Sequence, residues 1–150
     1  MGHTYSNILI HAIFSTKDRL PSIRDSLRER LYEYLAGIAQ REFGHAVIIG
    51  GTNNHLHGLL QVRCSVSVAE AIRKWKSLSS GWIRKSFVGN ENFSWQEGYG
   101  AFSVSQSNVS KITRYITNQV SHHKRITFEA ELLSFLKRNG IKYDAQHLWD

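Results

Sequence analysis

The chain has 150 residues, a net charge of +7 with neutral histidines, and one cysteine. This length suits one domain, residues 1–150, and the lone cysteine excludes an internal disulfide framework and is typical of the reducing cytoplasm. The sequence has no recognisable signal peptide and no apolar run long enough to cross a membrane. The basic charge favours a polyanionic partner, nucleic acid first.

The first half of the chain reads as strand, helix, strand, strand. Residues 5–14 are rich in isoleucine and aromatic residues and predict a strand. Apolar residues then recur at helical spacing, which predicts a helix from Ile23 to Phe43. Residues 45–50 and 55–62 predict two further strands, and the short glycine-rich connection between them predicts a hairpin.

The second half begins with a helix and ends with helices. Ser67 is followed three residues later by Glu70, a capping box that starts a helix. The next elements are a loop, a strand and two helices, at residues 87–100, 101–105, 107–124 and 128–139. This order predicts an α+β fold: a ferredoxin-like (RRM-like) antiparallel sheet with helices on one face, plus appended C-terminal helices. Such a sheet is a common platform for nucleic acid but does not fix the function.

A pair of histidines lies on the expected third strand. His55 and His57 are two residues apart, so both point to one face of the sheet, whereas Leu56 and Leu60 point to the other. Two convergent imidazoles can form half of a metal site, although a bare pair also suits a half-exposed sheet face. His11 on the first strand could lie nearby, and we expect it to be structural.

The expected third helix offers further groups for chemistry on a phosphodiester. Tyr115 and Gln119 are four residues apart and therefore share one helical face. The side-chain oxygen of Gln119 can be a third metal ligand. The phenol of Tyr115 can be a nucleophile once a metal and cationic neighbours favour its phenolate. Packing or solvation would explain each residue alone, but their combination with the histidine pair in a basic protein favours a catalytic site.

Basic side chains on two of the expected helices are the candidate DNA contacts. On the second helix they form a polar side with few acidic residues, which suits either a solvated face or contact with phosphates. On the third helix they surround Tyr115. The candidate DNA-binding residues are Arg73, Lys74, Lys76, Arg84, Lys85, Lys111, Arg114, His122 and Lys124.

These motifs resemble the single-tyrosine HUH transposases of the insertion-sequence 200/605 type and their relatives associated with repetitive extragenic palindromes. The matching stretches are Phe14–Lys17, His55–His57, Trp95–Val104 and Tyr115–Gln119, so the resemblance covers nearly the whole chain. Such relatives often carry Asp before the first histidine, where this chain has Asn54. Asn54 would weaken the support or the local charge around a metal-binding histidine, but the change from Asp does not remove a metal ligand.

The resemblance implies metal-dependent cleavage and rejoining of single-stranded, hairpin-bearing DNA. Tyr115 would attack a phosphorus to give a 5′-phosphotyrosine and a free 3′-hydroxyl, and a later 3′-hydroxyl would reverse the attack. His55, His57 and Gln119 would hold Mg²⁺ or Mn²⁺, of which two imidazoles favour Mn²⁺. The resemblance also implies a homodimer in which the helix that carries Tyr115 serves the histidines of the partner.

Three other interpretations remain open. A module that binds nucleic-acid hairpins without catalytic activity is disfavoured, because the strand positions that would stack bases are histidines rather than aromatic residues. A hydrolase that activates water at the histidine pair lacks an evident carboxylate base. A domesticated relative that binds hairpins but has lost mobility is compatible with the sequence.

Overall fold

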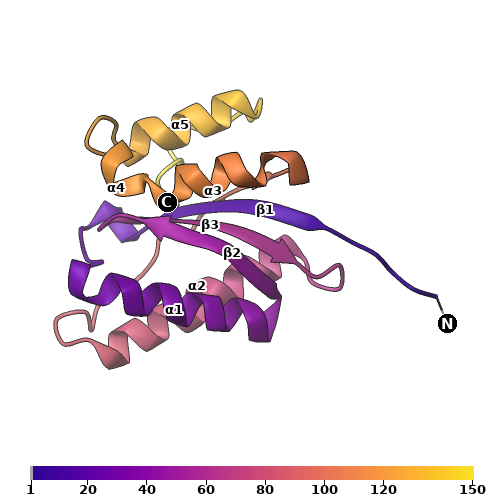
Figure 1. Cartoon of the computed structure of the whole chain (residues 1–150). Helices are drawn as coiled ribbons and strands as arrows, with labels where there is room; N and C mark the ends of the chain where they lie inside the picture. The colour runs from indigo at the N-terminus through magenta and orange to yellow at the C-terminus, as the bar shows by residue number, and fades with distance from the viewer. Residues whose placement is uncertain (1) are drawn as a thin grey trace.

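The computed structural model describes residues 2–150, in which an antiparallel sheet carries helices on both faces (Figure 1). The strands lie in the order β2-β3-β1-β4, and each neighbouring pair is antiparallel. In chain order they are β1 (Ile8–Ser15), β2 (Gly44–Gly51), β3 (His55–Val62) and β4 (Gly100–Ser103). The central strands β3 and β1 are buried along most of their length, so polar side chains on them are shielded from water.

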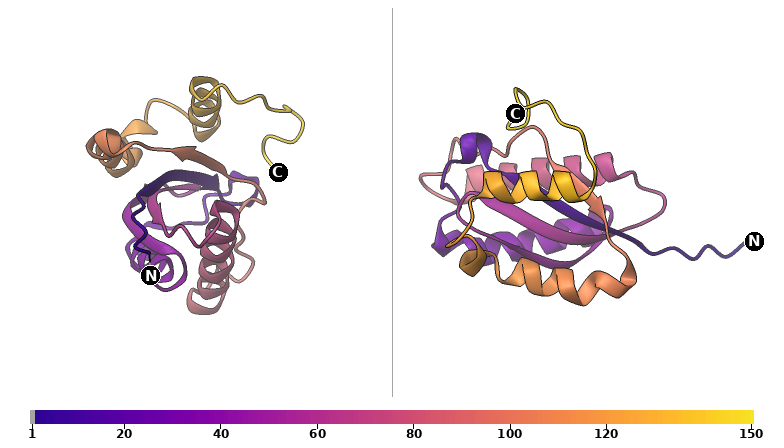
Figure 2. Two further views of the ribbon diagram at one scale, coloured as in Figure 1. Left: turned by 90° about the vertical axis from the view of Figure 1, so that its right-hand side faces the viewer. Right: turned by 90° about the horizontal axis from the view of Figure 1, so that it is seen from above.

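Two layers of helices enclose the sheet. The helices are α1 (Asp25–Glu42), α2 (Val68–Ser86), α3 (Val109–Thr117), α4 (Gln119–His122) and α5 (Phe128–Arg138), with 3-10 turns at Lys17–Arg19 and Gln106–Asn108. Helices α1 and α2 cover one face, and α3 to α5 lie over the other (Figure 2). The predicted ferredoxin-like α+β fold is confirmed, and the appended helices form the second layer. None of the helices within residues 2–150 is long and apolar enough to span a membrane.

The larger core lies between the sheet and helices α1 and α2. The apolar stripe predicted for the first helix is fully buried, and Trp75 of α2 packs edge-on against Phe14 of β1 and Phe43. Ser67 caps α2 as predicted, because its hydroxyl oxygen accepts the backbone N–H of Glu70. Periodicity and capping in the sequence therefore account for this half of the molecule.

The predicted continuous third helix is wrong, because it breaks at Asn118. There the backbone has φ −95° and ψ 21°, so α3 ends before this residue and α4 begins after it. Asparagine side chains compete with the helical backbone for hydrogen bonds and favour helix ends. After the break, Gln119 is fully buried and the apolar Val120 is 51% exposed.

A glycine sets how closely α3 approaches the sheet. A Cβ atom added at Gly50 on β2 would lie 2.3 Å from the backbone oxygen of Ile116 on α3. Since Tyr115 precedes Ile116, the height of α3 above β2 fixes where the tyrosine lies relative to β3.

We predict that Gly50→Ala destabilises the fold by about 1–3 kcal/mol, because an overpacked contact forces the backbone of α3 away from β2. The measurement is urea unfolding followed by circular dichroism. The matched control is Gly81→Ala in α2, where the nearest atom to the new Cβ is 3.9 Å away. This change should stabilise the helix by about 0.5–1 kcal/mol. A Gly50→Ala protein as stable as the wild type would contradict the close packing of α3 on β2.

Candidate active site

The histidine pair lies where the sequence predicts it. His55 and His57 of β3 are both fully buried and face α3, α4 and α5, while Leu56 and Leu60 belong to the core on the other side. The alternation of side chains along β3 produces this separation. The two imidazoles are therefore covered by the second layer of helices rather than half exposed.

Tyr115 and Gln119, the two residues predicted on the third helix, contact the histidines from the layer of helices that covers them. Gln119 Oε1 lies 2.9 Å from His55 Nε2. The ring of Tyr115 lies edge-on to the ring of His57, with 5.7 Å between centroids. The break at Asn118 does not separate Tyr115 from Gln119, because the amide of Gln119 donates to the backbone oxygen of Tyr115. One chain thus brings together all four residues that sequence analysis proposed as ligands and nucleophile.

A carboxylate that sequence analysis missed lies in the middle of this site. Glu131 of α5 is 1% exposed, and its Oε1 lies 2.9 Å from His57 Nε2 and 3.0 Å from His123 Nε2. Its Oε2 accepts the hydroxyl of Tyr115. The signal was present in the sequence: a glutamate interrupts the apolar stripe of an amphipathic helix, where a charge needs a buried partner. The argument that a hydrolase would lack a carboxylate near the histidines is therefore wrong.

Residues outside the cluster hold the two imidazole rings. His11 Nε2 lies 2.8 Å from His57 Nδ1, in the structural role expected for it. His55 Nδ1 lies 2.9 Å from Asn54 Oδ1 and 2.9 Å from Thr52 Oγ1. The amide oxygen of Asn54 can accept the Nδ1 proton as a carboxylate would, so the substitution keeps the orientation of the ring and removes only the charge.

Burial governs the protonation of the site. Desolvation, and secondarily the charge of His57, lowers the pKa of His11 and of His55 to about 3. Burial alone would raise the pKa of Glu131, but hydrogen bonds from His123 and His57 outweigh it and hold that pKa well below its usual range. Burial and the adjacent Glu131 carboxylate raise the pKa of Tyr115 well above its ordinary value. The expected stabilisation of a phenolate by cationic neighbours is thus not what Tyr115 meets, since its contact is a carboxylate.

We predict that the folded state loses stability as the pH falls below about 6.5, because unfolded histidines bind protons there whereas His11 and His55 do not until about pH 3. His11→Gln should flatten this loss by up to about 1.4 kcal/mol per pH unit. Urea unfolding between pH 7 and pH 4.5 measures the slope, with His45→Gln at an exposed position of β2 as control. Equal slopes for His11→Gln and the wild type would contradict the assigned cost of protonating His11.

The cluster has the composition of a metal site. His55, His57, His123 and Glu131 each offer one ligand atom, and these atoms all lie within 4.8 Å of one another. Imidazole nitrogen and carboxylate oxygen together suit a divalent transition metal, and a neutral amide oxygen from Gln119 is adjacent. The residues present therefore fit a divalent ion.

Helix α2, which carries five of the candidate DNA-binding residues, lies on the face of the sheet opposite α3 (Figure 1). The predicted scarcity of acidic partners is wrong for two of them, because Arg73 pairs with Glu70 and Lys74 pairs with Glu42. Lys85 is exposed. This face therefore carries less free positive charge than the sequence suggests.

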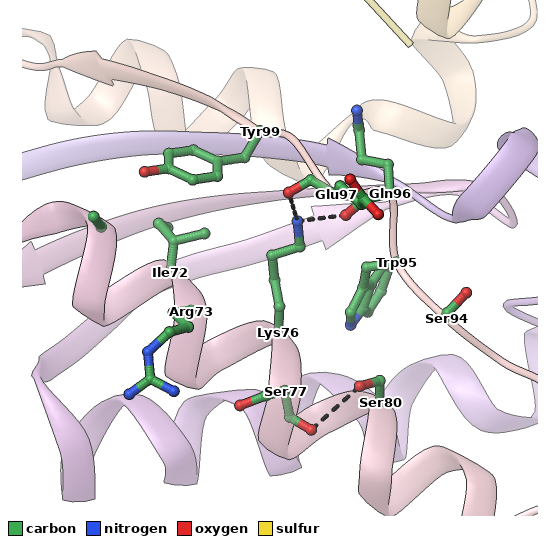
Figure 3. Close-up of a pocket in the computed structure, with 11 residues that line it drawn as sticks. Ile72, Arg73, Lys76, Ser77, Ser80, Ser94, Trp95, Gln96, Glu97 and Tyr99 are labelled. Carbon is green, nitrogen blue, oxygen red and sulfur yellow. Dashed lines mark hydrogen bonds between the residues drawn. The ribbon is translucent and has the colours of Figure 1, made fainter. Parts of the chain in front are cut away.

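Two other cations of α2 are engaged by backbone oxygens. The ammonium of Lys76 donates to the carbonyl oxygens of Gln96, Glu97 and Gly98 at the edge of a 480 Å³ hollow, as Figure 3 shows for the first two. Arg84 donates to the carbonyl oxygen of Phe93 at 3.0 Å. Both side chains fix the segment that leads to β4, a use that helical spacing alone does not reveal.

The candidates on α3, on α4 and just after α4 belong to the helical layer that covers the site. Lys111, Arg114 and Lys124 are exposed. His122 belongs to the site itself, since its Nε2 lies 3.4 Å from the hydroxyl of Tyr115. The exposed basic surface of the second layer of helices therefore lies on the same side of the sheet as Tyr115 and the histidines.

Comparison with known proteins defines the class as a transposase, a DNA-processing enzyme. The family described as Transposase IS200 like matches residues 4–119, a stretch that contains the histidine pair, Tyr115 and Gln119. The chain belongs to the IS200-like transposase family. The resemblance stated from the sequence is thereby confirmed.

Solved structures show the same fold. A protein of Deinococcus radiodurans R1, described as a candidate transposase, has 23% identity and a TM-score of 0.62, over 79% of this chain and 96% of its own. A REP-associated tyrosine transposase bound to a REP hairpin has 12% identity and a TM-score of 0.52, over 77% of this chain and 68% of its own. A search of curated proteins finds no match.

Proposed function

We propose that the protein cuts and rejoins single-stranded, hairpin-bearing DNA in the cytoplasm, with Tyr115 as the nucleophile. The observation that carries this proposal is the shared contact of Glu131, which touches the hydroxyl of Tyr115 with one oxygen and the Nε2 atoms of His57 and His123 with the other. A tyrosine hydroxyl held beside three imidazoles in a basic transposase has the groups that phosphodiester transfer needs.

The proposed reaction exchanges one phosphodiester for another. The hydroxyl oxygen of Tyr115 bonds to a phosphorus of the DNA, and the bond from that phosphorus to the 3′ oxygen breaks. The phenolic proton ends on the departing 3′ oxygen, leaving a 5′-phosphotyrosine and a free 3′-hydroxyl. A 3′-hydroxyl from another strand later reverses the attack, so no external energy source is consumed.

His55 and His57 would hold the divalent ion, Mg²⁺ or Mn²⁺, with Gln119 as the neighbouring amide expected from the family resemblance. When bound, such an ion supplies positive charge for the phosphate oxygens and the leaving 3′ oxygen. Glu131 accepts the hydrogen bond of Tyr115 and thereby orients its hydroxyl. The raised pKa of Tyr115 keeps that hydroxyl protonated at neutral pH.

The DNA surface that we propose centres on the exposed cations of α3 and α4. Lys111, Arg114 and Lys124 lie on the same side of the sheet as Tyr115, so they can contact phosphates next to the scissile one. The REP-associated transposase with this fold was solved with a REP hairpin, which supports a hairpin as the bound form. On α2, Lys85 is an exposed candidate for hairpin contacts on the other face.

We predict that Tyr115→Phe abolishes a covalent protein–DNA adduct while DNA affinity stays within about threefold, because the ring keeps its packing and only the nucleophilic oxygen is lost. The protein is incubated with hairpin-bearing single-stranded DNA and Mn²⁺, and the adduct is separated on a denaturing gel and mapped by mass spectrometry. Tyr99→Phe, at a 41% exposed tyrosine outside the site, is the matched control and should keep the adduct.

Other outcomes of this experiment would favour another nucleophile or another function. An adduct that survives Tyr115→Phe would move the nucleophile to another residue. Cut DNA with no adduct in the wild type would favour a hydrolase that uses Glu131 and the histidines on water. Hairpin binding with neither product would favour a binding module without catalysis.

We also propose that the protein forms a homodimer. The segment that joins β4 to α3 is polar and exposed, so α3 could be exchanged between two copies with the same contacts that it makes within one. A single chain nevertheless brings Tyr115 against its own histidines. The sharing of sites between subunits, implied by the family resemblance, stays a prediction that complementation can decide.

If Tyr115 serves the histidines of its own chain, as its contact with His57 within one chain supports, heterodimers of His55→Ala with Tyr115→Phe, formed by co-expression, should stay inactive in adduct formation. Size-exclusion chromatography with light scattering establishes the dimer, and adduct formation is compared with that of each parent. Recovery of adduct toward half of the wild-type level would show instead that α3 is exchanged, since one of the two composite sites would then be intact.

A further inference from the structure

We propose that Glu131 is itself a ligand of the active-site ion, through Oε1, and that Gln119 acts mainly by holding Glu131. This inference rests on the proposed function for the presence of an ion at His55 and His57. It changes the ligand set from two histidines and an amide to two histidines and a carboxylate. It also places one side chain in contact with both the ion and the nucleophile.

The placement of Glu131 in the fold demands a charged or metal partner. It lies on the buried side of α5, between Phe128, Leu132 and Phe135, all of which are buried. Buried carboxylates are rare unless they are paired or bind a metal. Within residues 2–150, the ion pairs of Glu131 are with histidines and not with lysine or arginine.

The distances from Oε1 to the histidine nitrogens match the distances expected between two ligand atoms of the same metal ion. Oε1 lies 2.9 Å from His57 Nε2, 3.0 Å from His123 Nε2 and 3.6 Å from His55 Nε2. Two ligand atoms that are each about 2.1 Å from one ion and at right angles lie about 3 Å apart. A single ion beside these atoms can therefore contact Oε1 and the two strand histidines with small shifts of the side chains.

The remaining nitrogen of each strand histidine is already engaged. His57 Nδ1 contacts His11, and His55 Nδ1 contacts Asn54 and Thr52. A ring whose Nδ1 is bound in this way presents Nε2 to a metal in a fixed orientation. Both Nε2 atoms point to the Oε1 side of Glu131, which is the arrangement expected of ligands to one ion.

The two oxygens of Glu131 have different partners. Oε1 faces His55, His57 and His123. Oε2 accepts the hydroxyl of Tyr115 and the amide N–H of Gln119, the latter at 3.2 Å, and lies 3.3 Å from His122 Nε2. Gln119 thus donates to the carboxylate with its nitrogen while its oxygen lies near His55. Its amide group spans the site and fixes Glu131, so its removal should loosen the ligand rather than delete one.

The proposed set of ligands also determines which metal ions the site prefers. Two imidazoles with one carboxylate suit transition metals such as Mn²⁺, Co²⁺ or Zn²⁺, whereas Mg²⁺ prefers oxygen ligands alone. The two imidazoles set this preference, and the carboxylate adds a negative charge that a neutral amide ligand would not supply.

The test measures binding of metal alone to the full-length protein, without DNA. Mn²⁺ affinity is measured by electron paramagnetic resonance of the free ion for the wild type, Glu131→Gln, Gln119→Ala and Glu129→Gln. Glu129 is on the same helix but pairs with Arg19 at the surface, so its variant is the matched control. We expect Glu131→Gln to weaken binding by about 100-fold or more, Gln119→Ala by about tenfold, and Glu129→Gln by less than twofold.

Near-ultraviolet circular dichroism checks that each variant is folded. If Glu131→Gln is unfolded, the visible spectrum of Co²⁺ added to Glu131→Asp replaces it, because a shortened ligand shifts the ligand-field bands and a purely structural carboxylate does not. Equal Mn²⁺ affinity of Glu131→Gln and Glu129→Gln, or a larger loss for Gln119→Ala than for Glu131→Gln, would overturn the assignment.

The outcome separates this inference from the proposed function. Glu131-dependent Mn²⁺ binding without any Tyr115 adduct would keep the ligand and refute the transposase chemistry. A Tyr115 adduct in a protein whose Mn²⁺ affinity is independent of Glu131 would keep the chemistry and refute the ligand.

Discussion

A carboxylate buried on an apolar helix face is the constraint on which this site depends. Glu131 is 1% exposed, and its contacts reach β3 through His57, α3 through Tyr115 and α4 through Gln119. Since an unpaired buried charge is costly, these contacts hold α5 over the sheet more specifically than its apolar residues alone would. The same contacts place the tyrosine hydroxyl next to the imidazoles, so the stability of the second layer and the geometry of the site have one cause.

The two faces of the sheet differ in composition: one carries the apolar core and the other carries the polar cluster. On one face, α1 and α2 build a large apolar core against Leu56 and Leu60, with little polar content apart from hydroxyl groups such as Ser79. On the other face, the apolar contacts are smaller and surround the polar cluster. Packing on the first face can therefore fix the backbone of β3. Because side chains alternate along β3, the same backbone holds His55 and His57 in place on the other face.

The sequence allowed most of the sheet and the shared face of the two strand histidines to be predicted, because both depend on local patterns. The strand at 55–62 and the shared face of its histidines follow from period-two alternation, and the cap of α2 follows from the Ser67 capping box. The break at Asn118 was missed, because the apolar stripe reads through it and only tertiary packing selects the turn. Glu131 and His123 were missed for another reason. A glutamate within an apolar stripe indicates that it needs a buried partner, but the identity of that partner depends on contacts between elements about 70 residues apart. The partners of Lys76 could not be predicted for a similar reason: they are three backbone carbonyl oxygens, and every residue has one, so no side-chain pattern indicates them.

The central claim is that one chain builds a metal site whose carboxylate also holds the nucleophile. A crystal of the full-length protein soaked in Mn²⁺, with an anomalous difference map, tests this claim most directly. The account predicts one peak at about 2.2 Å from His55 Nε2, His57 Nε2 and Glu131 Oε1, with the Tyr115 hydroxyl still hydrogen-bonded to Glu131 Oε2. A peak bound by the histidines and Gln119 with Glu131 turned away, or no peak at the cluster, would contradict it.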